Sequence, residues 1–184
     1  MDKLDFDVIV VGGGPAGSSA ARMAAENGCT VALIEKEKEI AETVRTSGVT
    51  WISDIKKFGI PEECYNPIKK FSFCSPKNTV LIEDKIAKAA VLDVRKTYKF
   101  LASRAESSGS QVFVSTNVSE VLQDSNGNCT GVIAKSGERQ VQFNGKVVID
   151  ASGFASVVAK ELGYVKQWKK FGVGAEFEVK TEKL

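Results

Sequence analysis

The chain contains no histidine among its 184 residues. Histidine is the most frequent general acid/base and metal ligand in proteins, so we expect no metal centre. No apolar run approaches the ~20 residues that a membrane span requires. The first expected strand begins near Phe6, which leaves no room for a signal peptide. These absences predict a cytoplasmic protein without a membrane span.

The cysteines lack the spacing of a reactive or metal-binding pair. Cys29, Cys64, Cys74 and Cys129 lie far apart in the sequence, which excludes a CxxC motif and a zinc spacing. We therefore expect reduced thiols. A net charge of +2, with 43% hydrophobic and 26% charged residues, is that of an ordinary soluble protein. There is no basic excess that would favour a nucleic-acid partner.

What the chain does have is a glycine-rich turn between an apolar strand and a helix. The absence of polar alternation predicts a central parallel strand over Phe6–Val11. Three glycines follow with the spacing G-x-G-x-x-G, namely Gly12, Gly14 and Gly17. They permit a tight turn, the approach of a pyrophosphate and close helix packing, respectively. Pro15 and Ala16 begin a helix that ends at Gly28, and its free N–H groups and dipole predict an anion site.

An acidic residue follows where such a fold binds a ribose. The segment TVALIE predicts a second strand over Thr30–Glu35. Glu35 closes this strand roughly 20 residues beyond Gly17, the spacing typical of a ribose-binding acid. Its carboxylate would accept hydrogen bonds from ribose hydroxyls and repel a 2′-phosphate, although Lys36 beside it could accommodate additional phosphate. The order of strand, turn, helix, strand and acid predicts a dinucleotide site, but it leaves FAD and NAD(P) open.

Later segments supply further parts of an α/β fold. A helix capped by Asp93 is expected over the segment LDVRKTYKFLASRAESSG. Residues 111–145 alternate through a β-meander. Its turns are expected at Asn126-Gly127, Ser136-Gly137 and Asn144-Gly145. Val147–Gly153 predicts a buried strand whose small final residues leave room for a ligand, before a short helix that ends at Gly163.

Five motifs resemble the FAD-binding part of the geranylgeranyl reductase family, which belongs to the flavoproteins similar to para-hydroxybenzoate hydroxylase. In order, they are DVIVVGGGPAGSSAA, LIEK, VRTSG, LASRAESSG and VVIDASGFASVV. The resemblance spans nearly the whole chain and implies FAD as the cofactor. It also implies an α/β fold: a Rossmann-like FAD/NAD(P)-binding domain with a β-meander and part of an inserted, mainly β substrate domain.

A disulfide reductase is the main competitor within the flavoproteins. Such enzymes place a redox-active cysteine pair shortly after the second strand and carry a second glycine fingerprint for NADPH. Neither feature occurs here, since GVGAEF has Phe177 in place of the third glycine.

The resemblance also assigns residues to the cofactor. It places the pyrophosphate at Gly12 to Gly17 and the adenosine ribose at Glu35. The remaining contacts it implies are Arg45 and the backbone of Thr46, Ser47 and Gly48 near the flavin, Val118 near the adenine, and Asp150, Ala151, Ser152 and Gly153 as a further contact. Members usually begin the middle helix with an arginine, but Val94 stands there and Arg95 follows, turned by about 100°. Arg95 is retained as a candidate contact.

Two family features are missing. Many members carry Arg-Cys-Gly after the second strand, whereas Arg45 is followed here by Thr46, Ser47 and Gly48, so no role for that cysteine is expected. A third FAD motif built on Gly-Asp occurs nowhere in the sequence. We therefore expect the front half of a larger enzyme.

The expected domain division follows from these motifs. Residues 1–65 and 93–165 would form the FAD-binding domain, and 66–92 with 166–184 part of the substrate domain. Such a fragment is expected to be inactive alone and to hold FAD weakly or not at all.

The implied activity is hydride transfer from reduced flavin to C=C bonds of isoprenoid (geranylgeranyl) chains. The expected partners are a prenyl-lipid substrate, an external electron donor (NAD(P)H or a reduced ferredoxin-like protein) and a membrane surface contacted peripherally. Two alternatives stay open: a flavin monooxygenase or halogenase of the same fold, and a non-catalytic FAD-binding fragment.

No catalytic residue can be assigned. Without histidine, the proton donor must be a carboxyl, Cys, Tyr or water. Cys74 and Tyr65 are candidates because they lie in the expected substrate segment. Phe71 and Phe73 alternate on one face of an expected strand, which suits a prenyl-lined tunnel and equally an ordinary core.

Overall fold

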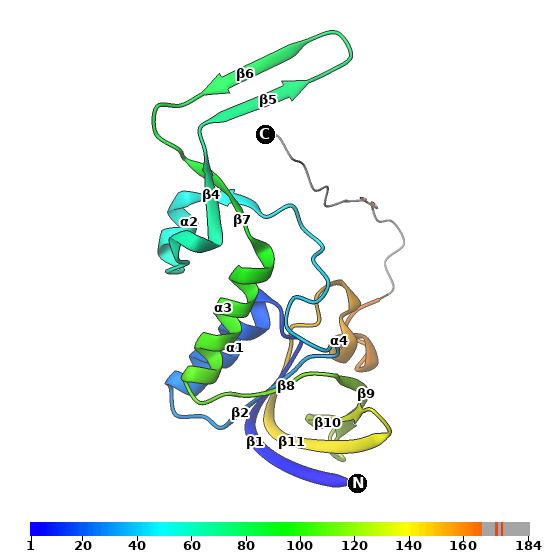
Figure 1. Cartoon of the computed structure of the whole chain (residues 1–184). Coiled ribbons are helices and arrows are strands. Elements are labelled where there is room, and N and C mark those ends of the chain that lie inside the picture. The colour runs from blue at the N-terminus through cyan, green and yellow to red at the C-terminus, as the bar shows by residue number, and fades with distance from the viewer. Residues whose placement is uncertain (167–171, 173, 175–184) are drawn as a thin grey trace. The chain divides into compact units, whose positions relative to one another are not determined.

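The computed structural model describes residues 1–166, 172 and 174, and it divides the chain into two compact units. Unit 1 contains Met1–Thr43 and resumes at Tyr98, whereas unit 2 contains Val44–Thr97. Helix α3 (Val94–Ser107) begins in unit 2 and continues in unit 1 (Figure 1). Most of the expected strand segment at 166–184 lies outside the described residues. The division into FAD-binding and substrate domains stays a prediction.

Unit 1 is built on a six-stranded sheet in the order β8-β2-β1-β11-β10-β9. The central strand β1 (Asp2–Val11) pairs in parallel with β2 (Val31–Ile34) and with β11 (Arg139–Asp150). On the outer side of β2 lies β8 (Gln111–Phe113), also parallel. The remaining strands, β9 (Thr116–Gln123) and β10 (Cys129–Ser136), form an antiparallel meander with β11. The apolar run after Phe6 is therefore central, as predicted, and the meander is confirmed.

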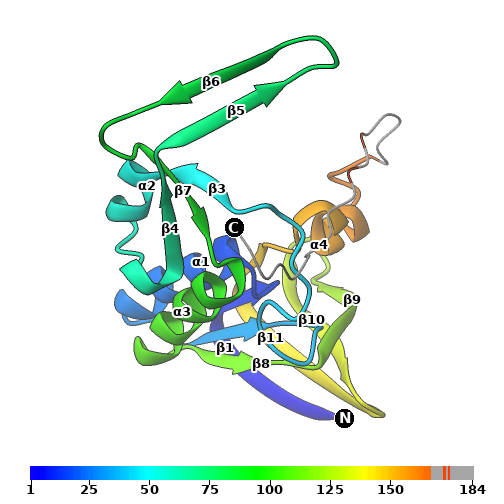
Figure 2. The same ribbon diagram turned by 45° about the horizontal axis from the view of Figure 1, so that its top comes forward.

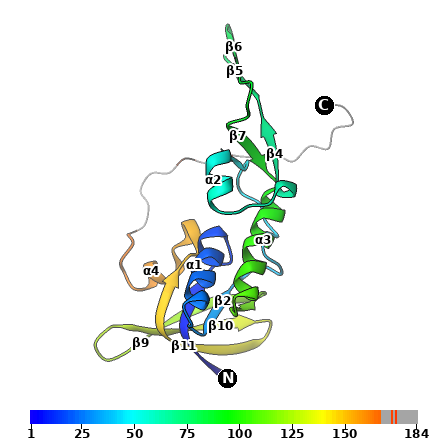
Figure 3. The same ribbon diagram turned by 90° about the vertical axis from the view of Figure 1, so that its left-hand side faces the viewer.

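Both faces of the parallel strands are covered, which explains why the last four residues of β1, Val8–Val11, are all apolar and buried. On one face, Val10 and Leu33 pack against Ala21 of helix α1 (Pro15–Glu26) and Ala105 of α3. The small alanines let the helices approach the strands closely. Figures 1 and 3 show α1 beside α3.

On the other face, the meander curls back over the parallel strands. Ile9 and Ile34 join one buried cluster with Val132, Phe143 and Val158, the last from helix α4 (Val157–Glu161). The aromatic rings of Phe113 and Phe143 meet edge to face, with centroids 5.0 Å apart. This cluster holds the strands of the meander against β1 and β2.

Two sequence-based boundaries require correction. Strand β1 begins at Asp2 rather than near Phe6, because its charged first residues pair with β11. The turn predicted at Asn144-Gly145 is wrong, since both residues lie inside β11. Asn144 pairs with Asp5 of β1 and its Nδ2 donates to that carboxylate at 2.9 Å, while a Cβ on Gly145 would lie 2.8 Å from the side chain of Ile9. The chain therefore stays extended along β1.

The described part of unit 2 contains two small antiparallel sheets. The first has three strands in the order β3-β7-β4: β3 (Val49–Trp51), β7 (Ala89–Leu92) and β4 (Tyr65–Ile68). Helix α2 (Ile52–Lys57) lies beside this sheet (Figure 2), and η1 (Glu62–Cys64) precedes β4. The second sheet is a hairpin of β5 (Lys70–Cys74) and β6 (Thr79–Glu83). No helix in the described part of the chain is long and apolar enough to cross a membrane.

Candidate functional site

The carboxyl ends of the three parallel strands β1, β2 and β11 meet at the glycine turn. The Gly12 N–H donates to the Ile34 carbonyl at 2.8 Å, and the Ala151 N–H donates to the Val11 carbonyl at 2.8 Å. Gly12 has φ +107°, and a Cβ there would overlap the Ala151 carbonyl oxygen. Only glycine fits this position, which confirms the tight turn predicted from the sequence.

The other two fingerprint glycines have different surroundings. A Cβ on Gly17 would overlap the Gly12 carbonyl oxygen and lie 3.3 Å from the Ala151 Cβ, so α1 packs directly on the turn. A Cβ on Gly14 would meet nothing within 4 Å. Gly14 is the N-cap of α1, and no described side chain caps the helix there. Pro15 has no N–H, and the amides of Ala16 and Gly17 have no acceptor within the helix. The open side of the turn therefore presents backbone donors.

Glu35 lies directly after β2 and faces this turn. Its Oε2 accepts the Gly13 N–H at 2.7 Å, and its Oε1 accepts the Glu37 N–H at 2.9 Å. The Thr116 N–H donates to the Glu35 carbonyl at 2.9 Å, which fixes the residue against the start of β9. A carboxylate offers about four lone-pair sites, so about two remain for hydroxyl donors.

Sequence reasoning missed the middle glycine of the turn. Gly13 is buried, and a Cβ there would overlap the Cδ1 of Ile40. Its carbonyl accepts a hydrogen bond from the buried hydroxyl of Ser18 at 3.1 Å. Three glycines in a row were the available signal, but the fingerprint leaves its second position unspecified.

Lys36 and Val118 lie in unit 1 with the turn. The exposed Lys36 has its Nζ 3.9 Å from the Glu37 Oε1. Val118 is half-buried on β9, paired with Ala134, and it follows Thr116 by two residues on the same strand. Alternation along a strand places Thr116 and Val118 on one face, near the end of β2 that carries Glu35.

Two parts of the segment Asp150–Gly153 have different roles. The backbone of Ala151 contacts the glycine turn, and the Asp150 side chain caps α4. Ala151 packs on Gly12, as described above. The Asp150 carboxylate accepts the Ser152 hydroxyl at 2.6 Å, the Ser152 N–H at 3.1 Å and the Ala159 N–H at 2.8 Å. Burial acts to raise the pKa of Asp150, but these hydrogen bonds outweigh it and hold the pKa below its ordinary value. Gly153 begins the short helix η2 (Gly153–Ala155) and is exposed.

The remaining predicted contacts belong to unit 2. Arg45, Thr46 and Ser47 are exposed and precede β3, and the buried Gly48 has φ +73°. Its carbonyl accepts the Leu92 N–H at 3.0 Å, which joins this segment to β7. Arg95 lies exposed in the first turn of α3.

The pKa values of two cysteine thiols are shifted in opposite directions, and one of them, Cys74, is a candidate acid from the sequence. Burial raises the pKa of Cys64. Hydrogen bonds with Ser72 and Thr79 lower the pKa of the exposed Cys74. Tyr65, the first residue of β4, is half-buried. Among the described residues, no cluster of three or more His, Cys, Asp or Glu side chains could hold a metal ion.

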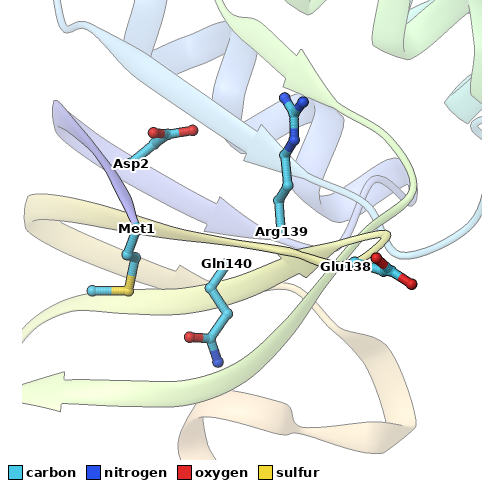
Figure 4. A pocket seen from close by; sticks show the side chains of 5 residues that line it. All are labelled: Met1, Asp2, Glu138, Arg139 and Gln140. Carbon is cyan, nitrogen blue, oxygen red and sulfur yellow. The ribbon is translucent and has the colours of Figure 1, made fainter.

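A surface hollow lies elsewhere in unit 1. Met1, Asp2, Glu138, Arg139 and Gln140 line it (Figure 4). Met1 and Asp2 lie at the amino end of β1, at the opposite end of that strand from the glycines. Glu138 lies in the turn before β11, and Arg139 and Gln140 begin β11. The hollow therefore takes no part in the candidate site.

Comparisons with known proteins agree with the geometry of the turn. The family model described as FAD dependent oxidoreductase matches residues 7–163. The digeranylgeranylglycerophospholipid reductase of Methanocaldococcus jannaschii is 35% identical over an alignment of 186 positions, which covers 97% of this chain and 46% of that protein.

Two solved structures extend the comparison. A geranylgeranyl bacteriochlorophyll reductase-like protein from Thermoplasma acidophilum has a TM-score of 0.75 and 31% identity, covering 83% of this chain and 40% of its own. The flavin-dependent brominase Bmp2 has a TM-score of 0.70 over 86% of this chain and 40% of its own, but at 22% identity it shows the fold alone. The matches confirm the predicted resemblance and fold class, and the chain spans less than half the length of each of these three proteins.

Proposed function

Since the chain belongs to the FAD-dependent oxidoreductase family, we propose that it is the FAD-binding part of a reductase that saturates C=C bonds of geranylgeranyl lipids. The observation that carries this proposal is the 35% identity, over 97% of the chain, with a reductase named for such a lipid. Family membership confirms FAD as the cofactor, which the glycine fingerprint alone left open.

The glycine turn fits the pyrophosphate of FAD. Gly14 leaves open space where a side chain would otherwise stand, and the backbone donors of Ala16 and Gly17 begin the helix beside it. The positive end of the helix dipole adds to the attraction for an anion. We assign Gly12, Gly14, Pro15, Ala16 and Gly17 to this part of the cofactor.

Glu35 fits the adenosine ribose. Its two bonds to the Gly13 and Glu37 amides orient the carboxylate and leave lone pairs for the ribose hydroxyls. Val118 would contact the adenine, and Lys36 would lie in solvent near the ribose. The backbone of Asp150, Ala151 and Gly153 would add a further contact, since the Asp150 carboxylate already caps α4.

The flavin end of the cofactor is assigned to Arg45, Thr46, Ser47 and Gly48, and Arg95 is assigned as a further contact with the cofactor. These assignments follow the resemblance and remain proposals, as does the division into an FAD-binding domain (residues 1–65 and 93–165) and a partial substrate domain (residues 66–92 and 166–184). The proposed partners are a prenyl lipid, NAD(P)H or a reduced ferredoxin-like protein, and a membrane surface contacted peripherally from the cytoplasm.

FAD supplies the hydride chemistry when bound, so the chain contributes binding, orientation and electrostatics. Cys74 remains a candidate proton donor, because it lies in the expected substrate segment and its thiol is exposed. Tyr65 is the second candidate. Each would have to lie against the reacting carbon to act, and a Cys74→Ser or Tyr65→Phe variant of the active protein tests that role.

The experiment that tests the reductase proposal uses the longest natural protein that carries this chain. The FAD-loaded protein is reduced with dithionite without oxygen and mixed with a geranylgeranyl lipid. A reductase product gains two hydrogens for each saturated bond, which mass spectrometry resolves. With NAD(P)H, oxygen and a halide salt, a product that gains an oxygen atom would instead identify the monooxygenase alternative, and a halogenated product the halogenase. FAD binding without any product would identify a non-catalytic fragment.

A further inference from the structure

The β5–β6 hairpin has two chemically different faces. Strand pairing sets Phe71 opposite Ile82 and Phe73 opposite Val80. Because side chains alternate along a strand, these four residues share one face, which we call the hairpin face. On the opposite face, the Lys70 Nζ lies 3.1 Å from the Glu83 Oε1.

The hairpin face is largely uncovered by the described part of the chain. Phe73 is 61% exposed, Val80 57% and Ile82 47%. A two-stranded hairpin alone is marginally stable in water, and contiguous exposed apolar side chains mark an interaction surface. Figure 3 shows the hairpin extending beyond β4 and β7, away from α2.

The charge around the hairpin is positive. Residues 69–88 contain five lysines against two acidic residues, Glu83 and Asp84. Lys70 pairs with Glu83, and Lys88 lies 3.2 Å from Asp84, so both acids are engaged. Lys69, Lys77 and Lys85 stand outside these two ion pairs, at the base, in the turn and after β6, respectively. Apolar side chains flanked by lysines suit an interface with anionic lipids.

We propose that the hairpin face docks onto an anionic phospholipid surface, with Phe73, Val80 and Ile82 entering the boundary between headgroups and acyl chains. The flanking lysines would lie near the lipid phosphates. This inference rests on the proposed function, because a prenyl-lipid substrate resides in such a surface, and it assigns the expected membrane contact to a hairpin.

Co-sedimentation with vesicles tests the proposal. The longest natural protein that carries this chain is mixed with vesicles of phosphatidylglycerol and phosphatidylcholine, and separately with vesicles of phosphatidylcholine alone. We expect binding to the anionic vesicles that high salt weakens. Replacing Lys77 and Lys85 by Gln should weaken binding about fivefold for each lysine. The triple variant Phe73→Thr/Val80→Thr/Ile82→Thr should weaken it more than about tenfold, while threonine preserves the strands.

Matched controls lie in unit 1. Val147→Thr removes an apolar side chain that is 51% exposed on β11, and Lys135→Gln removes an exposed lysine of β10, so both should bind vesicles as the wild type does. Circular dichroism verifies that each variant folds. Absence of wild-type binding, or equal binding by the triple variant and Val147→Thr, would overturn the proposal. A third result would also overturn it: the wild type is a dimer, and the triple variant is a monomer that binds vesicles as well as the wild type does. A second copy of the chain would then cover the hairpin face.

A separate assay keeps this inference apart from the proposed function. Reduction of a prenyl substrate dissolved in detergent does not require docking. Vesicle binding without that activity would contradict the reductase, whereas activity without vesicle binding would contradict the docking surface.

Discussion

We expect Gly17→Ala to destabilise the fold, whereas Gly14→Ala should leave stability near the wild-type value and weaken FAD binding. The two glycines belong to the same turn and lie close together in the sequence. Their surroundings differ completely, because a Cβ on Gly17 would overlap backbone and a Cβ on Gly14 would meet nothing within 4 Å. The pair therefore separates the packing role of the turn from its binding role.

The magnitudes follow from these contacts. At Gly17 the overlapping atom is the Gly12 carbonyl oxygen, with the Gly12 carbonyl carbon at 3.0 Å, so relief requires α1 to shift. Overpacking costs ~1–3 kcal/mol, and backbone contact places this case near the upper end. Alanine has a helix propensity ~1 kcal/mol more favourable than that of glycine, so the net decrease in the free energy of unfolding is ~2 kcal/mol. Gly14 has an extended backbone that alanine adopts readily. Alanine is slightly less favourable than glycine at an N-cap, but it also reduces the conformational entropy of the unfolded chain. These two effects on the free energy of unfolding are similar in size and opposite in sign.

Urea denaturation of the chain and FAD titration of the longest natural protein that carries it measure the two effects. For an m value of ~2 kcal/mol/M, Gly17→Ala should lower the urea midpoint by ~1 M. Gly14→Ala should raise the Kd for FAD by about tenfold or more, because its Cβ occupies the space through which the backbone approaches a pyrophosphate. Wild-type stability of Gly17→Ala would refute the packing argument, and wild-type affinity of Gly14→Ala would refute the assignment of the pyrophosphate to this turn.

Substitutions at three further positions test hydrogen bonds of single carboxylates. Glu35→Ala should weaken FAD binding about tenfold or more, with Glu35→Gln intermediate in calorimetric titration, because charged hydrogen bonds contribute ~1.5–3 kcal/mol. Asp93→Ala should lower the unfolding free energy by ~1 kcal/mol in urea, because its carboxylate accepts the Lys96 N–H at 3.0 Å and caps α3. Asp150 has a lowered folded-state pKa, so its carboxylate stabilises the fold at neutral pH, and this contribution is lost as the pH falls below about 4 through the folded pKa. Asp150→Asn should flatten the stability curve over that acidic range, and an unchanged curve would contradict the assigned hydrogen bonds.

The parts of the site predicted from the sequence are those set by neighbouring residues. The tight turn at Gly12, the helix after Pro15 and the position of Glu35 after a buried strand all follow from local geometry and short spacing. Asp93 acts as the predicted cap for the same reason. The strand β1 was predicted to be central because its apolar run has no polar alternation, and the sheet order confirms it.

The errors and omissions depend on residues far apart in the sequence. Asn144-Gly145 has the composition of a turn, yet Asp5, 139 positions away, pairs with it and holds it extended. A Cβ on Gly13 would overlap the Cδ1 of Ile40, a contact that no local pattern indicates. The exposed apolar side chains of β5 and β6 resemble core residues in the sequence, because a pattern cannot show whether another segment covers them.

The double pairing of β11 has a consequence for how unit 1 unfolds. Over residues 141–144 this strand is paired with β1 on one side and β10 on the other. The meander therefore cannot separate from the parallel strands unless the hydrogen bonds of β11 with β1 or with β10 break. We expect amide protons along this stretch to exchange with solvent only through global opening, so that unit 1 behaves as one foldon.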